Sequence, residues 1–343
     1  MRKIKVLVVE DSIFFRELLV KHLNNDPALE VVASARDPFE ARDMIVKYKP
    51  DVMTLDIEMP RMNGIEFLRK LMPQYPMPVV MISSLSDKVF DALNAGAVDF
   101  VVKPSMSDHK KLEELMTTEL PIKIKIASTA KIGMIKKTTV PVLTETVKTK
   151  NTKDLILAIG ASTGGTEAIA TILKEFGPDI PGTVIVQHMP AGFTEMYANR
   201  LNDQCRVTVK EAKNGDKVLP GQVLIAPGGD CQMRLIKGNG VYQVEIKPGP
   251  KVSGHCPSVD VLFESVAKSA GNRALGIILT GMGGDGAKGL LEMRKAGART
   301  IGQDESTCIV YGMPKVAFDI GAVECQEKLG DIAKKTYAIL NKM

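Results

Sequence analysis

The sequence contains little that would indicate a membrane protein, a metal centre or an exported protein. No run approaches the roughly 18 uninterrupted apolar residues that predict a membrane-spanning helix. The N-terminal residues lead directly into a strand pattern, without the features of an export signal. The five cysteines are scattered and lack the paired spacing of a zinc site or a redox motif. We therefore expect a cytoplasmic protein with reduced thiols and no membrane insertion.

Aromatic residues are also scarce, at 5% with no tryptophan, but the remaining composition is that of a globular protein. The 343 residues exceed one typical domain, at a prior of roughly 150 residues per domain. Between residues 122 and 152 the sequence has no sustained period of 2 or 3.6. We predict domains at residues 1–121 and 153–343, joined by a linker at 122–152. Much of the net charge of +5 lies in this linker, which we interpret as solvated, with DNA binding as an alternative.

The first domain alternates short apolar runs with amphipathic segments, which is typical of βα units. The runs predict strands at residues 6–9, 51–55, 79–82 and 100–102, and helices at 12–23, 64–72 and 87–96. Ser12 is expected to cap the first helix. The pattern as a whole predicts five βα units and a five-stranded parallel sheet.

Polar side chains follow several of these strands at the point where each strand ends. Glu10 and Asp11 follow the first strand, and Asp56 ends the third. The carboxyl ends of parallel strands converge, so the three acids should meet in one crevice, where Mg²⁺ would offset their repulsion. Ser83 ends the fourth strand and Lys103 the fifth, which adds a hydroxyl and an ammonium group. This set suits the transfer of a phosphoryl group to Asp56.

On these residues, the first 120 positions resemble a response-regulator receiver domain, which has a flavodoxin-like fold. The resemblance implies that Asp56 accepts a phosphoryl group from a chemotaxis sensor histidine kinase. It implies a magnesium site formed by Glu10, Asp11, Asp56 and the carbonyl of Glu58. It also implies a conformational switch formed by Ser83, Phe100 and Lys103.

A second α/β pattern begins at residue 155. It predicts strands at residues 155–159, 183–187, 223–226, 274–279 and 299–301, and helices at 259–269 and 331–340. Two shorter runs, 232–236 and 241–246, flank a Gly-Asn-Gly segment and predict a hairpin. Strands that alternate with helices predict a doubly wound α/β domain with a mostly parallel sheet covered on both faces.

Three residues at the ends of these strands suggest a hydrolase. Ser162 lies in a G-x-S-x-G pattern, which exposes a serine hydroxyl on a sharp strand-to-helix turn. His188 follows the next strand and is the preferred base, and Asp285 could orient its imidazole. Backbone N–H groups around Met282 could receive an oxyanion. The chain order Ser, His, Asp differs from that of α/β-hydrolases, so we predict a convergent triad that needs no cofactor.

The loop that carries Asp285 also supports a competing interpretation. Gly281 to Gly286 fits G-x-G-x-x-G after a strand, and Asp304 follows the next strand, as in dinucleotide-binding oxidoreductases. We rank this alternative second, because it would place a carboxylate beside a pyrophosphate and leave Ser162 and His188 unexplained. A non-enzymatic receiver output is a further alternative.

Four segments of the second domain resemble the catalytic domain of the chemotaxis receptor protein-glutamate methylesterases. They are Gly160–Gly165, Gln187–Pro190, Pro257–Asp260 and Thr280–Ala287. The resemblance implies hydrolysis of γ-glutamyl methyl esters in the cytoplasmic domains of methyl-accepting chemoreceptors, with release of methanol. Deamidation of receptor glutamines is implied as well. Cys256 departs from the family, in which we expect an arginine, and this affects the expected substrate binding at that edge.

The resemblance also assigns roles to individual residues. Ser162 would attack the ester carbonyl, His188 would relay the proton and Asp285 would orient His188. The oxyanion would lie beside Thr163 and the Met282 amide. His255 is expected to border the substrate groove, while Ser258 and Asp260 are interpreted as helix caps. Phosphorylation at Asp56 is expected to loosen a receiver that covers the Ser162 cleft.

Overall fold

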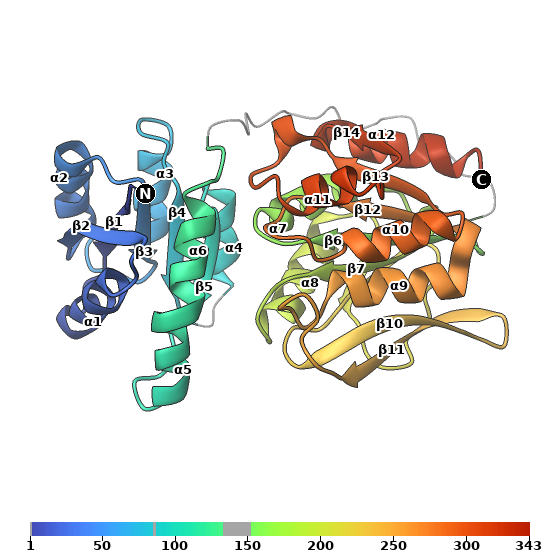
Figure 1. Cartoon of the computed structure of the whole chain (residues 1–343), viewed down its shortest axis with the longest axis horizontal. Helices are drawn as coiled ribbons and strands as arrows, with labels where there is room; N and C mark the ends of the chain where they lie inside the picture. The colour runs from blue at the N-terminus through green and yellow to red at the C-terminus, as the bar shows by residue number, and fades with distance from the viewer. Residues whose placement is uncertain (1, 85–86, 133–151) are drawn as a thin grey trace. The chain divides into compact units, whose positions relative to one another are not determined.

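The computed structural model describes residues 2–84, 87–132 and 152–343. The chain divides into two compact units, Met1–Gly133 and Met134–Met343, which are described separately (Figure 1). Within the described ranges, the helices are all too short or too polar to cross a bilayer.

The first unit is a five-stranded parallel sheet in the order β2-β1-β3-β4-β5, as in flavodoxin-like folds. The strands are β1 (Ile4–Val9), β2 (Leu29–Ala35), β3 (Val52–Asp56), β4 (Val79–Ser83) and β5 (Asp99–Val102). The helices are α1 (Ile13–Asn24), α2 (Pro38–Tyr48), α3 (Gly64–Leu71), α4 (Lys88–Asn94), α5 (His109–Glu114) and α6 (Leu120–Ala127), with a π-helical turn at Leu115–Glu119 between the last two. The predicted fold is confirmed for this unit.

The first turn of α1 shows how individual residues determine where a helix begins and which face it buries. The Ser12 hydroxyl accepts a hydrogen bond from the Phe15 amide at 3.4 Å, which satisfies one of the unpaired donors of the first helical turn. Phe15, Leu19 and Leu23 recur at helical spacing and are buried. The cap and the apolar face together place the β1–α1 loop, which carries Glu10 and Asp11, at the carboxyl edge of the sheet.

The predicted linker begins too early, because α6 continues through the expected boundary at residue 121. Pro121 lies in the first turn of this helix, where its missing N–H costs nothing. Ile124 and Ala127 are buried. Lys123 forms an ion pair with Asp99 of β5, with Nζ and Oδ1 2.7 Å apart, so part of the positive charge expected in a solvated linker is neutralised by the first unit. Residues 133–151 of the predicted linker lie outside the described residues.

The second unit is built on a seven-stranded sheet in the order β14-β13-β12-β6-β7-β9-β8. Every neighbouring pair is parallel, so the sheet is more regular than the mostly parallel one predicted. Its strands are β6 (Ile156–Ala161), β7 (Gly182–Gln187), β8 (Thr208–Glu211), β9 (Gln222–Ile225), β12 (Ala274–Ile278), β13 (Arg299–Gln303) and β14 (Cys325–Glu327). Every residue of β6 and β7 is buried, because helices cover both faces of the sheet (Figure 1).

The α-helices of this unit follow the pattern of a doubly wound domain. They are α7 (Gly165–Glu175), α8 (Phe193–Gln204), α9 (Val259–Ala270), α10 (Ala287–Lys295), α11 (Met313–Asp319) and α12 (Leu329–Leu340). The edge strands β8 and β14 escaped prediction because each is short and only partly buried. They therefore lack the continuous apolar run of the central strands.

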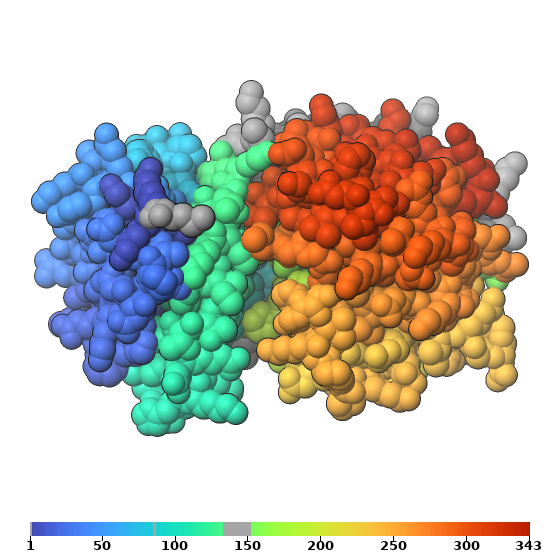
Figure 2. Space-filling model, viewed as in Figure 1, coloured from blue at the N-terminus to red at the C-terminus, as the bar shows by residue number. Residues whose placement is uncertain are grey.

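The predicted hairpin is present as β10 (Cys231–Gly238) and β11 (Val241–Pro248). Asn239 and Gly240 form its two-residue loop, and both have positive φ, as a type I′ turn requires. The buried face of the hairpin packs against α9, and Figure 2 shows its surface continuing into that helix. Gln232, on β10, is thereby fully buried beside the segment that leads into α9.

Candidate functional sites

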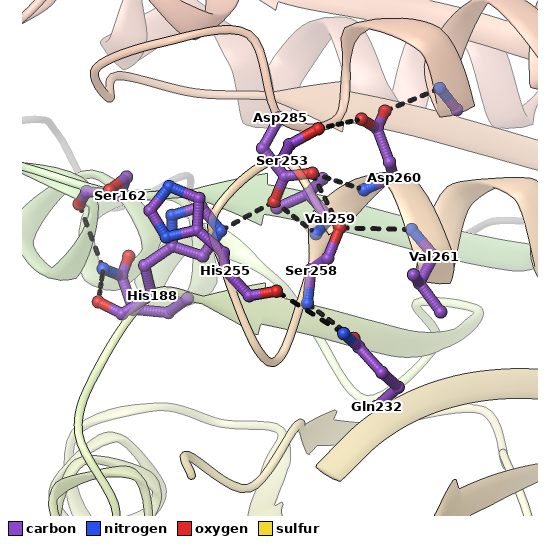
Figure 3. Close-up of polar contacts among 12 residues, drawn as sticks. Ser162, His188, Gln232, Ser253, His255, Ser258, Val259, Asp260, Val261 and Asp285 are labelled. Atoms are coloured by element: carbon purple, nitrogen blue, oxygen red, sulfur yellow. Dashed lines mark hydrogen bonds and ion pairs between the residues drawn. The ribbon is translucent and has the colours of Figure 1, made fainter. Parts of the chain in front are cut away.

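The three predicted residues of the hydrolytic site follow three adjacent strands, β12, β6 and β7. Hydrogen bonds of the sheet continue beyond these strands and fix the segments that carry them. The Ser162 amide donates to the Thr280 carbonyl at 3.0 Å, and the His188 amide donates to the Ala161 carbonyl at 3.1 Å. Figure 3 draws Ser162, His188 and Asp285 on segments that follow these neighbouring strands.

His188 and Asp285 form a direct pair. His188 Nε2 lies 2.8 Å from Asp285 Oδ2, and both side chains are almost fully buried. Asp285 also accepts hydrogen bonds from the first turn of α9: the Val259 amide at 2.8 Å and the Asp260 amide at 3.0 Å. Burial alone would raise the pKa of Asp285, but the hydrogen bond and charge of His188, with these further donors, lower it to about 2. Asp285 is therefore a carboxylate at neutral pH.

The pairing with Asp285 determines the tautomer of His188. A carboxylate can only accept, so Nε2 carries a proton, and in the neutral imidazole Nδ1 then has the free lone pair. Nδ1 is buried and makes no hydrogen bond within the described residues. The predicted contact between the base and the Ser162 hydroxyl is therefore not formed. In Figure 3, Ser162 lies on the opposite side of the imidazole ring from Asp285.

Two glycines allow the chain to turn closely at Ser162: one follows it in sequence and the other belongs to the loop after β12. Gly164 directly precedes α7 and has a φ of +78°. Residues with a side chain rarely adopt this backbone conformation. At Gly281, an added Cβ would lie 2.7 Å from the Ser162 Cβ, so a larger residue could not approach this closely. This close approach places the backbone that leads into Met282 beside Ser162. Met282 has an exposed side chain, whereas Thr163 is buried.

His255 lies against the proposed base. Its ring stacks on the His188 ring, with centroids 3.7 Å apart and planes inclined by 9° (Figure 3). Its carbonyl accepts a hydrogen bond from Gln232 Nε2 at 3.4 Å, which connects the His255 loop to the hairpin. The stacking limits rotation of the His188 ring. No periodicity in the sequence indicates it, because the two residues are far apart in the chain.

Ser258 and Asp260 are more than the helix caps that the sequence suggested. Ser258 does cap α9, since its hydroxyl accepts from the Val261 amide at 3.4 Å. The same hydroxyl donates to Asp285 Oδ1 at 2.7 Å. The Asp260 carboxylate accepts from the Gly289 amide at 2.8 Å and so connects α9 with α10. Burial and the neighbouring Asp285 charge raise the pKa of Asp260, although the Gly289 bond opposes this.

The predicted acidic crevice of the first unit is also present. Carboxylate oxygens of Glu10, Asp11 and Asp56 lie within 4.8 Å of one another. Lys103 Nζ contacts Glu10 Oε1 at 2.8 Å and Asp56 Oδ2 at 3.0 Å. Burial and the Asp56 charge raise the pKa of Glu10 to about 7, even though Lys103 acts in the opposite direction. Three converging carboxylates that repel one another fit a hard cation such as Mg²⁺.

The remaining predicted residues lie directly after β3 (Glu58), at the end of β4 (Ser83) and on β5 (Phe100). The Glu58 amide donates to Asp56 Oδ1 at 3.0 Å, so the chain turns back over Asp56 directly after β3. The Ser83 hydroxyl donates to the Ser84 carbonyl at 2.8 Å. Phe100 is buried, and the Lys123 ammonium lies 5.4 Å from the centre of its ring.

Fold and site together define a response-regulator receiver followed by a parallel α/β enzyme. The receiver family, described as "Response regulator receiver domain", matches residues 6–116. The family described as "CheB methylesterase" matches residues 157–336. The chain therefore belongs to the CheB methylesterase family.

Similar proteins support both assignments. A protein-glutamate methylesterase/protein-glutamine glutaminase of Syntrophomonas wolfei is 64% identical over 100% of this chain and 99% of the relative. One from Syntrophotalea carbinolica is 52% identical over 99% of each. The crystal structure of the Thermotoga maritima CheB methylesterase catalytic domain is 35% identical, with a TM-score of 0.53, and covers 55% of this chain and 100% of that chain.

The dinucleotide alternative gains no support from these comparisons. Asp285 lies inside the glycine pattern, but its carboxylate is engaged by His188, Ser258 and the first turn of α9. Asp304, the expected ribose ligand, instead accepts a hydrogen bond from the Ser306 amide at 2.9 Å.

Proposed function

We propose that this chain is a phosphorylation-regulated esterase that hydrolyses γ-glutamyl methyl esters in the cytoplasmic domains of chemoreceptors. One observation carries the proposal. The His188–Asp285 pair holds the proton of the neutral imidazole on Nε2, which leaves the Nδ1 lone pair available at the edge of the sheet where Ser162 lies. The relatives are protein-glutamate methylesterases, which indicates the substrate class, and their similarity over the whole chain supports extending that class to this protein.

In the proposed reaction, Ser162 Oγ attacks the ester carbonyl and His188 Nδ1 takes its proton. Asp285 keeps the Nε2 proton in place and stabilises the imidazolium that forms. The tetrahedral oxyanion would lie beside the backbone amides of Thr163 and Met282. When this intermediate collapses, the Nδ1 proton passes to the methoxide and methanol leaves. A water molecule, activated by Nδ1, then hydrolyses the acyl-enzyme to free glutamate and Ser162.

The same steps account for deamidation of glutamine. The acyl-enzyme is identical, and the proton from Nδ1 passes to a leaving amine, which departs as ammonia. The relatives' names include glutaminase activity, and we extend it to this chain on that basis. No cofactor is needed for either reaction as proposed.

The direct test is methanol release by the full-length protein from a methylated chemoreceptor cytoplasmic fragment, measured by gas chromatography. We expect one methanol for each glutamate residue regenerated, with the glutamate counted by mass spectrometry. The assay includes Mg²⁺ and a small phosphodonor, so that an inhibited state cannot mask the activity. Absence of methanol under these conditions would contradict the proposed function.

We assign regulation to the first unit. Glu10, Asp11, Asp56 and the Glu58 carbonyl would hold Mg²⁺, which neutralises phosphoryl oxygens when bound. A sensor histidine kinase would transfer its phosphoryl group to Asp56. Lys103 already contacts Asp56, and it would then pair with the new phosphoryl oxygens while Ser83 donates a hydrogen bond to one of them. With Phe100, these residues would act as the switch.

Asp56→Asn is expected to abolish stimulation by a phosphodonor and to leave the basal rate within about twofold of wild type. The amide cannot accept the phosphoryl group, and Asp56 lies outside the hydrolytic site. Methanol release with and without phosphodonor provides the measurement. Asp51→Asn is the matched control, because Asp51 lies at the opposite end of β3 and pairs with Arg2. A phosphodonor response in the Asp56→Asn protein would refute the assignment.

A further inference from the structure

Gln187 connects the two residues that the proposed reaction needs close together. It is the last residue of β7, directly before His188, and is 3% exposed. Its Nε2 donates to the Ser162 carbonyl at 3.0 Å and to the His188 carbonyl at 3.1 Å. One buried amide group therefore joins the turn of the nucleophile to the residue that carries the base.

This connection extends the sheet beyond its last regular pair. The β6–β7 register ends at Ala161 opposite Gln187. Past this point, the His188 amide bonds to the Ala161 carbonyl, and the Gln187 side chain supplies the remaining links to the Ser162 turn. Without the amide, the distance between the Ser162 and His188 side chains would depend on fewer hydrogen bonds.

The oxygen of the same amide group does not stabilise the fold through a hydrogen bond. Gln187 Oε1 is buried and accepts no hydrogen bond from the described residues. It lies against the first residue of α7, since a Cβ added at Gly165 would be 2.1 Å from it. A buried acceptor without a partner costs free energy that an apolar side chain of similar shape would avoid. The two donated bonds are thus the feature that distinguishes glutamine from such a residue here.

We propose that Gln187 is a positioning residue that sets the separation between Ser162 and His188. This inference rests on the proposed function, because it presumes a proton transfer from Ser162 Oγ to His188 Nδ1. That hydrogen bond is not formed in the described structure, so the approach of the two groups depends on how their loops are held. Gln187 acts through both backbones and touches no reacting atom.

The test is Gln187→Met in the full-length protein, which keeps the length of the side chain and removes both donated bonds. We expect kcat for methanol release to fall by roughly 10²-fold, since small misplacements of reacting groups have effects of this size. KM should stay within about twofold, because Gln187 makes no contact with substrate in the proposed reaction. A partial loss of folding would also lower the apparent kcat and leave KM unchanged, so kcat is calculated per folded molecule, with the folded fraction measured by far-ultraviolet circular dichroism.

Gln222→Met is the matched control. Gln222 is the first residue of β9, so it lies at the amino ends of the strands, whereas the site lies at their carboxyl ends. Its Oε1 is likewise buried without a hydrogen-bond partner in the described part of the chain. We expect wild-type kcat for this variant. Gln187→Glu is the second test variant, because a carboxyl group keeps the shape and has at most one proton to donate. At least one of the two bonds is therefore lost, and kcat should fall as well.

The outcomes are distinct. Wild-type kcat in folded Gln187→Met or Gln187→Glu protein, judged by far-ultraviolet circular dichroism, would overturn the positioning role. Failure of both variants to fold would also overturn it, because the amide would then serve stability. If wild-type protein releases no methanol, the proposed function itself fails. If wild-type protein is active and the folded Gln187 variants match its kcat, the function stands without this inference.

Discussion

Full-length Ser162→Ala protein is expected to release methanol from methylated receptor at least roughly 10⁴-fold more slowly than wild type. The substitution removes the atom that attacks the ester, and a water molecule held by His188 is a poor substitute. The backbone bond from the Ser162 amide to the Thr280 carbonyl remains, and so does the acceptor role of the Ser162 carbonyl. The thermal unfolding temperature should therefore change little, and methanol measured over hours will report chemistry alone.

Ser269→Ala serves as the control for this variant. Ser269 lies in the last turn of α9 and donates to the Leu235 carbonyl at 2.9 Å, well away from the three catalytic candidates in the fold. Its methanol release should match that of wild type. Equal release by Ser162→Ala and wild-type protein would remove the serine nucleophile from the proposal, although the family assignment would be unaffected.

Asp285→Asn is expected to lower kcat by roughly 10³- to 10⁴-fold, by changing the tautomer of His188. Asp285 accepts four hydrogen bonds, from His188, the Ser258 hydroxyl and the amides of Val259 and Asp260. An asparagine has one acceptor oxygen and one NH₂ group, so its NH₂ must face some of these donors. If it faces His188, Nε2 becomes the acceptor and Nδ1 carries the proton. The imidazole can then no longer take a proton from Ser162.

The same substitution is expected to change how the free energy of unfolding depends on pH. The pKa of Asp285 is lowered from 3.8 to about 2 in the folded state. A lowered carboxyl pKa contributes stability that is complete above pH 4 and is lost as pH falls through 2. The shift corresponds to about 2 kcal/mol. Asp260 acts in the opposite sense, because burial and the Asp285 charge raise its pKa, and Asp285→Asn removes the second of these causes. Wild type should thus exceed Asp285→Asn in unfolding free energy at pH 6, with the difference shrinking toward pH 2.

Urea unfolding of both proteins at several pH values provides this measurement. Asp216→Asn is the control, since Asp216 pairs with Lys210 on a more exposed surface and lies outside the site. It should retain wild-type kcat. A constant difference between wild type and Asp285→Asn from pH 6 to pH 2.5 would contradict the ionised, hydrogen-bonded state of Asp285.

Much of the candidate site could be predicted from local sequence patterns. Ser162, His188 and Asp285 each follow a buried strand, and parallel strands bring their carboxyl ends to one edge. The same rule located Glu10, Asp56 and Lys103 in the first unit. Predictions failed where the local pattern was weak, as at the partly buried edge strands β8 and β14, or where a basic, proline-containing segment proved to be the helix α6.

The sequence by itself determined which residue types stand at the strand ends and hence the chemistry available to this protein. It determined the order of strands and helices, because hydrophobic periodicity and turn residues act over a few positions. Only the tertiary structure decided how the site is completed: His255 stacked on His188, Ser258 bonded to Asp285, and Gln187 between Ser162 and His188. These contacts join residues from separate elements, and their geometry depends on how whole strands and helices pack rather than on any local pattern.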